Sequence, residues 1–473
     1  MITRSNNETR STSETTKSPA GRTYLGTTTV KRRLKWIGLV SLIPIIFLIA
    51  IVSFIGYRET IASGELKAKL EELRQAGEPF DDKSMTKYFE NNTHKEGTAA
   101  WTEIITLSLA ANAITHKLPV VGYGSIPFDL SPGSEWPDEP RVAEFLQEVR
   151  PLIHKIYKAD EFPKPVWMPI FFNGTSTLLP EIQESRSTAR VLYLDAFHAL
   201  YHKEGERALQ DIHALVSVAQ AFDWEFCIVT KLVSTAIHRM HRDTINRSLG
   251  MDVWNDEQLA ALSNYINHPH EVSKAWRATL AGERGMAYPV LSDMRKLRGT
   301  ELSGIDALMG LPVMPSTKLT VLRAYDDLQH CADAGDVGLV TQAEAAEARF
   351  YMNQPLSQAG IFWRLLIPGV SSYAEMLDRF ETNRRLTYAS VAVKLYQVRN
   401  KRWPKSLSEL ADVGLVANDW TTTNRQPFGY EVKEDMAYVW AYSNSDKKTV
   451  PKERPKLDPA DTDGYLEHLV SIR

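Results

Sequence analysis

Residues 36–57 read WIGLVSLIPIIFLIAIVSFIGY, which is 22 residues without a charged side chain. As an α-helix this stretch would be about 33 Å long, because each residue adds about 1.5 Å. The hydrocarbon core of a bilayer is about 30 Å thick, so such a helix can cross it. The sequence therefore predicts a single transmembrane helix within residues 31–58, and the lipid bilayer is the first partner that we expect.

The residues on either side of this stretch predict its orientation. Four basic residues precede it: Lys31, Arg32, Arg33 and Lys35. On the other side, Arg58 is followed directly by Glu59. Because basic flanks stay in the cytoplasm, we expect a cytoplasmic N-terminus, with Trp36 and Tyr57 at the two interfaces. The alternative is a cleaved secretory signal, but the apolar run exceeds the usual length of about 7–15 residues and no clear cleavage site follows it.

Residues 1–30 are predicted to form a disordered cytoplasmic tail, because they are rich in Ser, Thr and Asn and contain few apolar side chains for a core. The first 35 residues contain eight basic and two acidic residues, a net charge of +6; since the whole chain carries −3, the rest carries −9. A mildly acidic body without a basic stripe has no broad attraction for polyanions. We therefore expect no nucleic acid as a partner.

Residues 59–370 are predicted to form an extracytoplasmic helical domain. Apolar residues recur at helical spacing in 64–76 and in 180–249, and turn signals within 180–249 indicate three antiparallel helices. Asn255 and Asp256 should cap another helix. Further helices are expected at 98–117, 141–158, 269–284, 316–334 and 341–352. Hairpins of helices joined by short turns suggest a repeat-like arrangement, although the sequence has no fixed-period consensus.

Residues 371–473 are predicted to form a long helix, a small α+β cap and a tail. The long helix should span 372–400 and end before Pro404, and Leu407 and Leu410 should pack a short helix back against it. Strand-like alternation at 428–432 and 436–442 indicates one β-hairpin. The predicted fold class is therefore mainly α, with a single N-terminal transmembrane helix and a β-hairpin near the C-terminus.

These C-terminal residues resemble a known module. Residues 399–410 read RNKRWPKSLSEL, 426–430 read QPFGY and 437–443 read AYVWAYS. The pattern resembles the C-terminal module of type II secretion pseudopilins, which also occurs in membrane proteins of planctomycetes and verrucomicrobia. The stretches GEP at 77–79, EGERAL at 204–209 and AGER at 281–284 resemble an uncharacterised membrane-anchored helical family of the same bacteria. The resemblance implies location and architecture, without a known activity.

The chain also departs from the pseudopilin pattern. Trp420 stands where the module usually has proline, and no Asp- and Gly-rich loop for calcium follows Ser443. The apolar helix lacks the glycine cleavage site and the glutamate of prepilin-peptidase substrates. We therefore expect neither a bound calcium ion nor assembly into a pilus.

Two histidine pairs are the candidate metal ligands. His198 and His202 are spaced i, i+4, and a helix would place both imidazoles on one face, where they could bind zinc. Ala199 occupies the position of the catalytic glutamate, which excludes the HExxH type of zinc hydrolase. His238 and His241, spaced i, i+3, could complete the site if their helices pack side by side. The alternative interpretation is that all four are ordinary histidines on helix faces.

No other motif predicts chemistry. The sequence contains no P-loop, nucleophile elbow or dinucleotide fingerprint, so we expect no cofactor and assign no catalytic residue. Cys227 lies in an apolar run and should be a buried free thiol, and a bridge to Cys331 stays open as the alternative. Carboxylates such as Asp378 and Glu381 would act as acid and base only if two of them met in one pocket.

Three functions are compatible with these observations. The leading hypothesis is a membrane-anchored extracytoplasmic scaffold that binds a protein partner through its helical faces. The first alternative is an extracytoplasmic hydrolase or metal-binding enzyme built on the histidines or on buried carboxylates. The second alternative, a component of a secretion apparatus, rests on the C-terminal module alone, and a fold does not determine a function.

Overall fold

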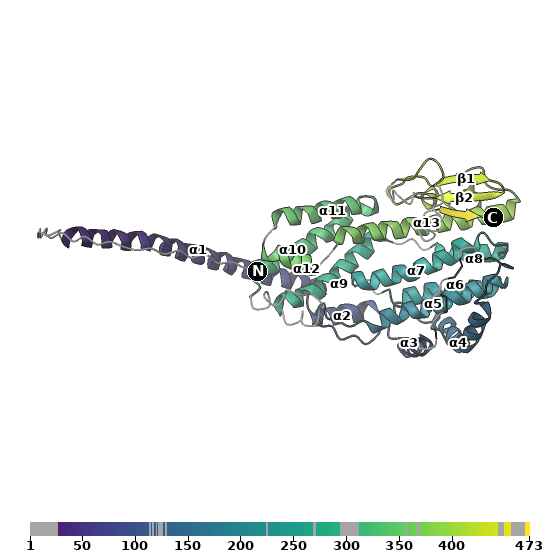
Figure 1. The fold of residues 1–473 in the computed structure, drawn as a ribbon, viewed down its shortest axis with the longest axis horizontal. Coiled ribbons are helices and arrows are strands. Elements are labelled where there is room, and N and C mark those ends of the chain that lie inside the picture. Colours follow the sequence, from purple (N-terminus) through teal and green to yellow (C-terminus); the bar gives the residue numbers. More distant parts are fainter. Residues whose placement is uncertain are drawn as a thin grey trace, which may run out of the picture. The chain divides into compact units, whose positions relative to one another are not determined.

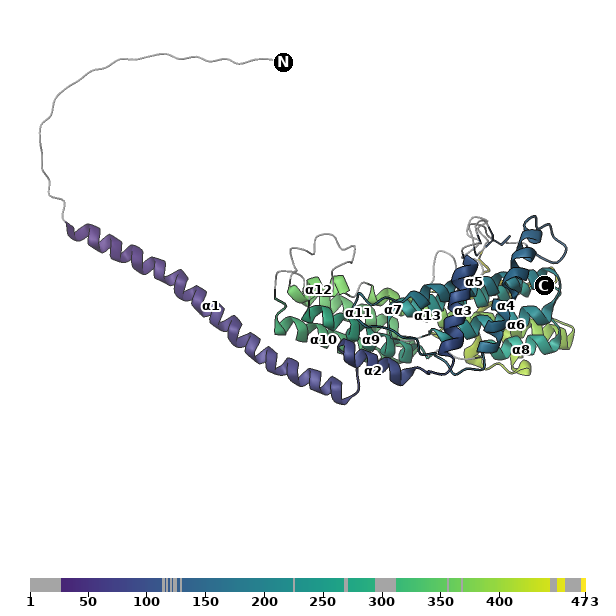
Figure 2. The same cartoon turned by 90° about the horizontal axis from the view of Figure 1, so that it is seen from below.

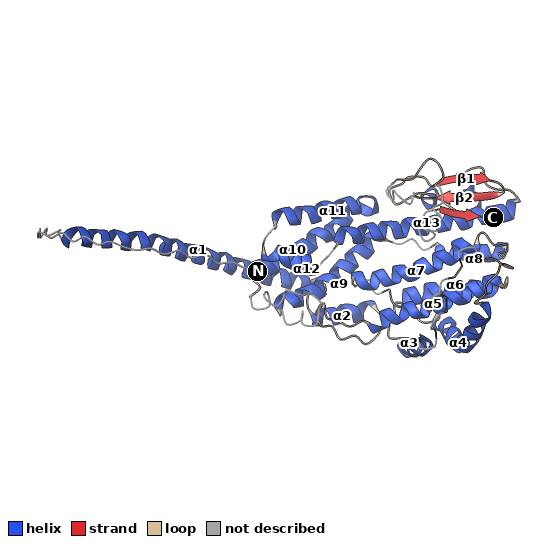
Figure 3. Cartoon of the chain, viewed as in Figure 1, coloured by secondary structure: helices blue, strands red, loops and turns tan. Residues whose placement is uncertain are grey.

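The structure is a computed structural model of the chain. It describes residues 27–112, 115, 118–119, 121, 126–127, 130–223, 226–267, 271–293, 312–354, 357–366, 369–442, 449–455 and 469–473, with side chains from residue 42 onward. Most of the predicted tail, residues 1–26, lies outside this description. The described part is mainly helical, as Figure 3 shows, and its contacts divide it into the units Met1–Ile61 and Ala62–Arg473.

Helix α1 (Thr27–Gln75) contains the predicted span, with Pro44 inside the helix. Its side chains at residues 42–58 are exposed. For example, Phe47 is 67% and Phe54 is 65% exposed. Among the described residues, α1 is the helix that is long and apolar enough to cross a membrane. The separate helix predicted at 64–76 is instead the continuation of α1, because no proline or cap interrupts the helix after Tyr57.

The second unit begins with the last residues of α1 and three further helices. Helix α2 (Asp82–Asn92) starts at a capping box in which the Asp81 carboxylate accepts the Ser84 N–H at 2.7 Å. Helix α3 (Thr98–Asn112) and helix α4 (Glu139–Ala159) follow. Both were predicted, although residues 113–114 and 116–117, at the predicted end of α3, lie outside the described part.

Helices α5 (Pro180–Tyr201), α6 (Gly205–Ala221) and α7 (Ile228–Ser248) are the three antiparallel neighbours that the sequence predicted. They lie side by side in Figure 1. Helix α5 is buried on nearly all sides in its second half, from Val191 to Leu200. Helix α8 (Asp256–Ile266) follows, and a capping box between Asn255 and Gln258 starts it, as predicted.

The next helices surround a second apolar cluster that contains Trp276, Tyr325 and Trp363. They are α9 (Val272–Ser292), α10 (Pro315–His330), a 3₁₀ turn η3 (Cys331–Ala334), α11 (Gly335–Asn353), α12 (Gln358–Leu366) and α13 (Val370–Asn400). Helix α12 was not predicted, because nine residues are too few to establish a periodic pattern. Cys227 and Cys331 are both buried free thiols.

The C-terminal cap has the predicted hairpin and one additional strand. Two 3₁₀ helices, η4 (Leu407–Val413) and η5 (Ala417–Trp420), precede β1 (Gly429–Lys433), β2 (Met436–Trp440) and β3 (Leu469–Ile472). The strands form an antiparallel sheet in the order β1-β2-β3. Glu434 and Asp435 turn the hairpin with φ of 54° and 62°, values expected for a two-residue hairpin turn.

Candidate functional site

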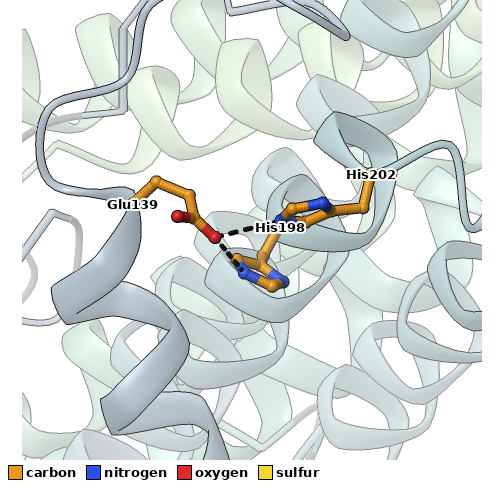
Figure 4. A group of neighbouring side chains, drawn as sticks. All are labelled: Glu139, His198 and His202. Atoms are coloured by element: carbon orange, nitrogen blue, oxygen red, sulfur yellow. Dashed lines mark hydrogen bonds and ion pairs between the residues drawn. The ribbon is translucent and has the colours of Figure 1, made fainter.

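The predicted pair His198 and His202 meets a carboxylate that the sequence analysis did not single out. His198 lies in the last turn of α5 and His202 is the C-cap residue directly after it, and their ring centroids are 4.6 Å apart. Glu139, the first residue of α4, places Oε1 at 3.1 Å from Nε2 of His198 and at 3.0 Å from Nε2 of His202. Figure 4 shows the carboxylate facing both imidazoles. We call these three side chains the Glu139 cluster.

The hydrogen bond at the other ring nitrogen of His198, Nδ1, determines which tautomer the ring adopts. Nη2 of Arg207, on α6, lies 2.8 Å from Nδ1 of His198. A guanidinium group can only donate hydrogen bonds, so Nδ1 must be the acceptor. The proton of the neutral ring is then on Nε2, which donates to Glu139. Burial, followed by the charge of Arg207, lowers the pKa of His198, which favours this neutral form.

Glu139 is the anionic centre of the cluster. The hydrogen bond from His202 is the largest cause that lowers the pKa of Glu139, although partial burial opposes it. The side chain is 22% exposed and that of His202 is 40% exposed, so solvent reaches the cluster from one side. The N-terminus of α4 also favours a negative charge at this position. The cluster therefore fastens the start of α4 to the end of α5.

The distances in the Glu139 cluster would suit a divalent metal ion. The three ligand atoms lie within 4.8 Å of one another. Bonds of about 2.0–2.1 Å in a tetrahedral zinc site separate neighbouring ligands by about 3.3 Å. The two distances from Oε1 of Glu139 to the histidine nitrogens, 3.1 and 3.0 Å, are close to this value. The Arg207 contact does not suit a metal, because an Nε2 ligand needs its proton on Nδ1 and an acceptor beside it. The cluster could hold a metal only after Arg207 leaves Nδ1 of His198.

A buried polar network continues from Arg207 into the helix layer. Asp195 of α5 is fully buried and receives two hydrogen bonds from Arg150 of α4, at 2.5 and 3.1 Å. Tyr157 of α4 donates to Asp211 of α6 at 2.6 Å. Burial, followed by the charge of Asp195, raises the pKa of Asp211 well above its ordinary value. These contacts join α4 to α5 and α6, which Figure 2 shows beside one another.

The second histidine pair lies elsewhere. Helices α5 and α7 run parallel, because each is antiparallel to α6. Tyr193 of α5 donates a hydrogen bond to Asp243 of α7, which gives the register of the two helices. His198 follows Tyr193 by five positions, whereas His238 precedes Asp243 by five. The pairs are therefore separated by about 15 Å along the helices, and His238 and His241 do not complete the Glu139 cluster.

The motifs GEP at 77–79 and AGER at 281–284 meet in the structure. Arg284, which is 1% exposed, pairs with Glu78 and donates to the carbonyl of Pro79 at 3.1 Å. A Cβ atom on Gly282 would lie 1.5 Å from the carbonyl oxygen of Phe226, so only glycine allows this close approach. These motifs therefore make contacts that hold the domain together.

Glu283, in the same motif on α9, accepts a hydrogen bond from the start of the earlier helix α7. Its Oε1 accepts the backbone N–H of Ile228, the first residue of α7, at 2.7 Å. Burial raises the pKa of Glu283 to about 7. The carboxyl group thus belongs to the packing of α7 against α9.

The predicted membrane-flanking residues all lie in α1. Lys31, Arg32, Arg33, Lys35 and Trp36 belong to its first ten residues, and Tyr57 is 68% exposed. The basic residues precede the exposed apolar segment along one continuous helix. This arrangement agrees with a basic flank next to a membrane-spanning segment.

Comparisons with protein-family models, with curated proteins and with solved structures find no match to this chain. The resemblance to a membrane-anchored helical family and to the pseudopilin module therefore stays a prediction.

Proposed function

We propose that the protein is a single-pass membrane protein whose helical domain lies outside the cytoplasm and binds a protein partner. The exposed apolar segment of α1 supports the anchor. The basic residues Lys31, Arg32, Arg33 and Lys35 support a cytoplasmic N-terminus, because such flanks resist translocation. The lipid bilayer is then the first partner of the chain, and a protein is the second.

The observation that supports a protein partner is a pair of exposed apolar side chains on one loop. Between α4 and α5, Phe171 is 86% and Leu178 is 82% exposed. Soluble domains expose single apolar side chains often, but two large ones on one ordered loop are typical of interaction sites.

Hydrogen bonds hold this loop in place. Thr177 accepts the N–H of Asn173 at 3.0 Å through its hydroxyl oxygen and donates to the carbonyl of Gly174 at 2.6 Å. The N–H of Gly174 in turn donates to Asp82 of α2 at 3.0 Å. Phe171 and Leu178 flank this turn, so a partner would bind a loop that is already ordered and would lose little conformational entropy.

The size of the effect can be estimated. Full burial of a Phe or Leu side chain contributes about 1.5–3 kcal/mol, so the two together offer about 3–6 kcal/mol before the costs of association. A few anchors of this kind account for most of the affinity in protein interfaces. Replacement of both by serine should therefore abolish a moderate complex.

The experiment is photo-crosslinking in intact cells. A photoreactive amino acid is placed at position 171 or 178, with position 257 as the control, because Glu257 is exposed on α8 without being apolar. We expect one protein adduct, of the same identity, from positions 171 and 178 and none from 257, and we expect the double variant F171S/L178S to lose the partner in co-purification. Absence of an adduct at both loop positions, or the same adduct at 257, would overturn the proposal.

A further inference from the structure

Two fully buried aspartates lie close together between α4, α5 and α6. Asp195 of α5 and Asp211 of α6 are both 0% exposed. Apart from burial, the charge of Asp195 is the largest influence on the pKa of Asp211, so the two carboxyl groups interact. Both belong to residues 130–223, which the structure describes without a gap. The partners of the two groups can therefore be compared directly.

The cations around this pair are held by carboxylates other than Asp211. Arg150 of α4 donates two hydrogen bonds to Asp195, at 2.5 and 3.1 Å. Arg207 of α6 pairs with Glu204 at 3.0 Å and lies 3.9 Å from Asp195. Among the described residues, Asp195 thus has cationic partners, whereas none lies within ion-pair distance of Asp211.

Asp211 has a single hydrogen bond for its two oxygens. The hydroxyl of Tyr157 donates to Oδ1 at 2.6 Å, and the buried Oδ2 has no hydrogen-bond partner among the described residues. A buried carboxylate without a cation costs far more free energy than a neutral carboxyl group, so such a group keeps its proton. Burial, followed by the charge of Asp195, raises the pKa of Asp211 well above its ordinary value. The Tyr157 hydrogen bond and the two arginines oppose this shift without cancelling it.

The groups that act on Asp211 come from three helices. They are Arg150 and Tyr157 of α4, Asp195 of α5 and Arg207 of α6 itself. Helices α7 and α8 also pack against α6, but the pKa shifts of His241 on α7 and of Tyr265 on α8 arise from burial and from groups other than Asp211. The balance at Asp211 is therefore decided where α4 and α5 meet α6.

We propose that Asp211 keeps a proton in the folded protein at neutral pH and that the joint between α4 and α6 opens more easily as the pH rises. The neutral carboxyl group accepts the Tyr157 hydrogen bond without leaving a buried charge. When the joint opens, water reaches Asp211, and its proton passes to the solvent because a hydrated aspartate ionises near pH 3.9. Low pH therefore tightens this joint. The inference is independent of the proposed protein partner, because it depends only on buried contacts.

The test is hydrogen exchange of the full chain in detergent at several pH values, measured at residues 151–159 in the second half of α4. Observed rates divided by the intrinsic rates at each pH give the opening constant of the joint. D211N keeps an acceptor for Tyr157 but does not titrate. We expect the ratio of opening constants, wild type to D211N, to rise by up to about tenfold per pH unit, or about 100-fold between about pH 5 and pH 7. A ratio that does not change with pH would overturn the proposal.

E103Q is the matched control, because Glu103 of α3 pairs with Lys155 in the same part of α4. The distance is 2.9 Å, and the two side chains are 56% and 41% exposed. An exposed pair contributes little, so E103Q should change the opening constant by less than about fivefold at each pH. A pH-dependent ratio in E103Q equal to that in D211N would show that the trend does not arise from Asp211 and would overturn the proposal.

Infrared spectroscopy detects the proton itself. The difference spectrum between the wild type and D211N at neutral pH should contain the C=O stretching band of a protonated carboxyl group. A carboxylate band in its place would mean that Asp211 is ionised, which contradicts the proposal. D211S is a second neutral variant and should show the same pH trend in hydrogen exchange, so the test does not depend on the folding of a single variant. Circular dichroism checks that each variant is folded.

Discussion

Replacement of Arg284 should loosen the joint between the end of α1 and α9. The side chain of Arg284 is 1% exposed, and that of its ion-pair partner Glu78 is 37% exposed. Arg284 also donates to the carbonyl of Pro79 at 3.1 Å and to the side-chain oxygen of Gln329 at 3.0 Å. R284M keeps part of the side-chain volume and removes all three interactions. The free energy that the substitution costs can therefore be estimated from these contacts.

The two hydrogen bonds contribute about 1 kcal/mol each. The ion pair adds about 1 kcal/mol, less than a fully buried pair would, because water can rehydrate the partly exposed Glu78 once Arg284 is gone. The sum is about 3 kcal/mol, equivalent to a change of about 100-fold in the equilibrium for local opening. E78Q should reproduce only part of this loss, and the double variant should be less destabilised than the sum of the single variants, because the two residues interact directly.

Hydrogen exchange of the full chain in detergent measures this opening directly. The amide of Glu78 donates to the carbonyl of Leu73 at 2.9 Å and reports on the joint. R277M on the same helix is the matched control, because Arg277 pairs with Asp333 at the surface, where the two side chains are 45% and 59% exposed. We expect the control to speed this exchange by less than about fivefold, since exposed pairs contribute about 0–1 kcal/mol. Equal exchange rates in R284M and R277M would refute the reasoning.

The remaining predictions concern topology, metal binding and pH. Protease added to intact cells, with any outer envelope opened, should digest most of the chain, and digestion only in inverted membrane vesicles would contradict the proposed orientation. In calorimetric titrations R207Q should bind Zn²⁺ more tightly than the wild type, because His198 can then carry its proton on Nδ1, and equal affinities would contradict the assigned tautomer. Burial lowers the pKa of His238 to about 3 and that of His241 well below its ordinary value, so both rings stay neutral in the folded protein while the unfolded chain takes up protons below about pH 6.5. The contribution of these two rings to the free energy of unfolding should therefore be constant above that pH and fall below it, by up to about 1.4 kcal/mol per pH unit for each ring. Denaturant titrations at several pH values should show that the free energy of unfolding falls less steeply with decreasing pH in H241Q than in H330Q. Equal slopes in the two variants would contradict this prediction.

Several parts of the candidate site could not be predicted from the sequence. Glu139 is separated from His198 by 59 positions and from His202 by 63. Only the packing of α4 against α5 brings the carboxylate to the imidazoles. The i, i+4 spacing could identify the histidine pair, because that spacing acts within one helix. The tautomer of His198 on α5 depends on Arg207 on α6, and the contact between these two side chains depends on how α5 and α6 pack.

The sequence by itself determined the local features of this protein. The apolar run of α1, the periodicity of α5 to α7, the Asn255 cap of α8 and the β1–β2 hairpin all follow from interactions between residues close in the chain. Local signals of this kind are present before any tertiary contact forms.

Only the tertiary structure decided which side chains share an environment. Strand β3 joins the sheet from the last residues of the chain, Arg284 meets Glu78 across about 200 positions, and a cavity beside His241 is lined by residues of four helices. Such contacts depend on how whole helices pack, and packing is a property of complementary surfaces that no short stretch of sequence contains.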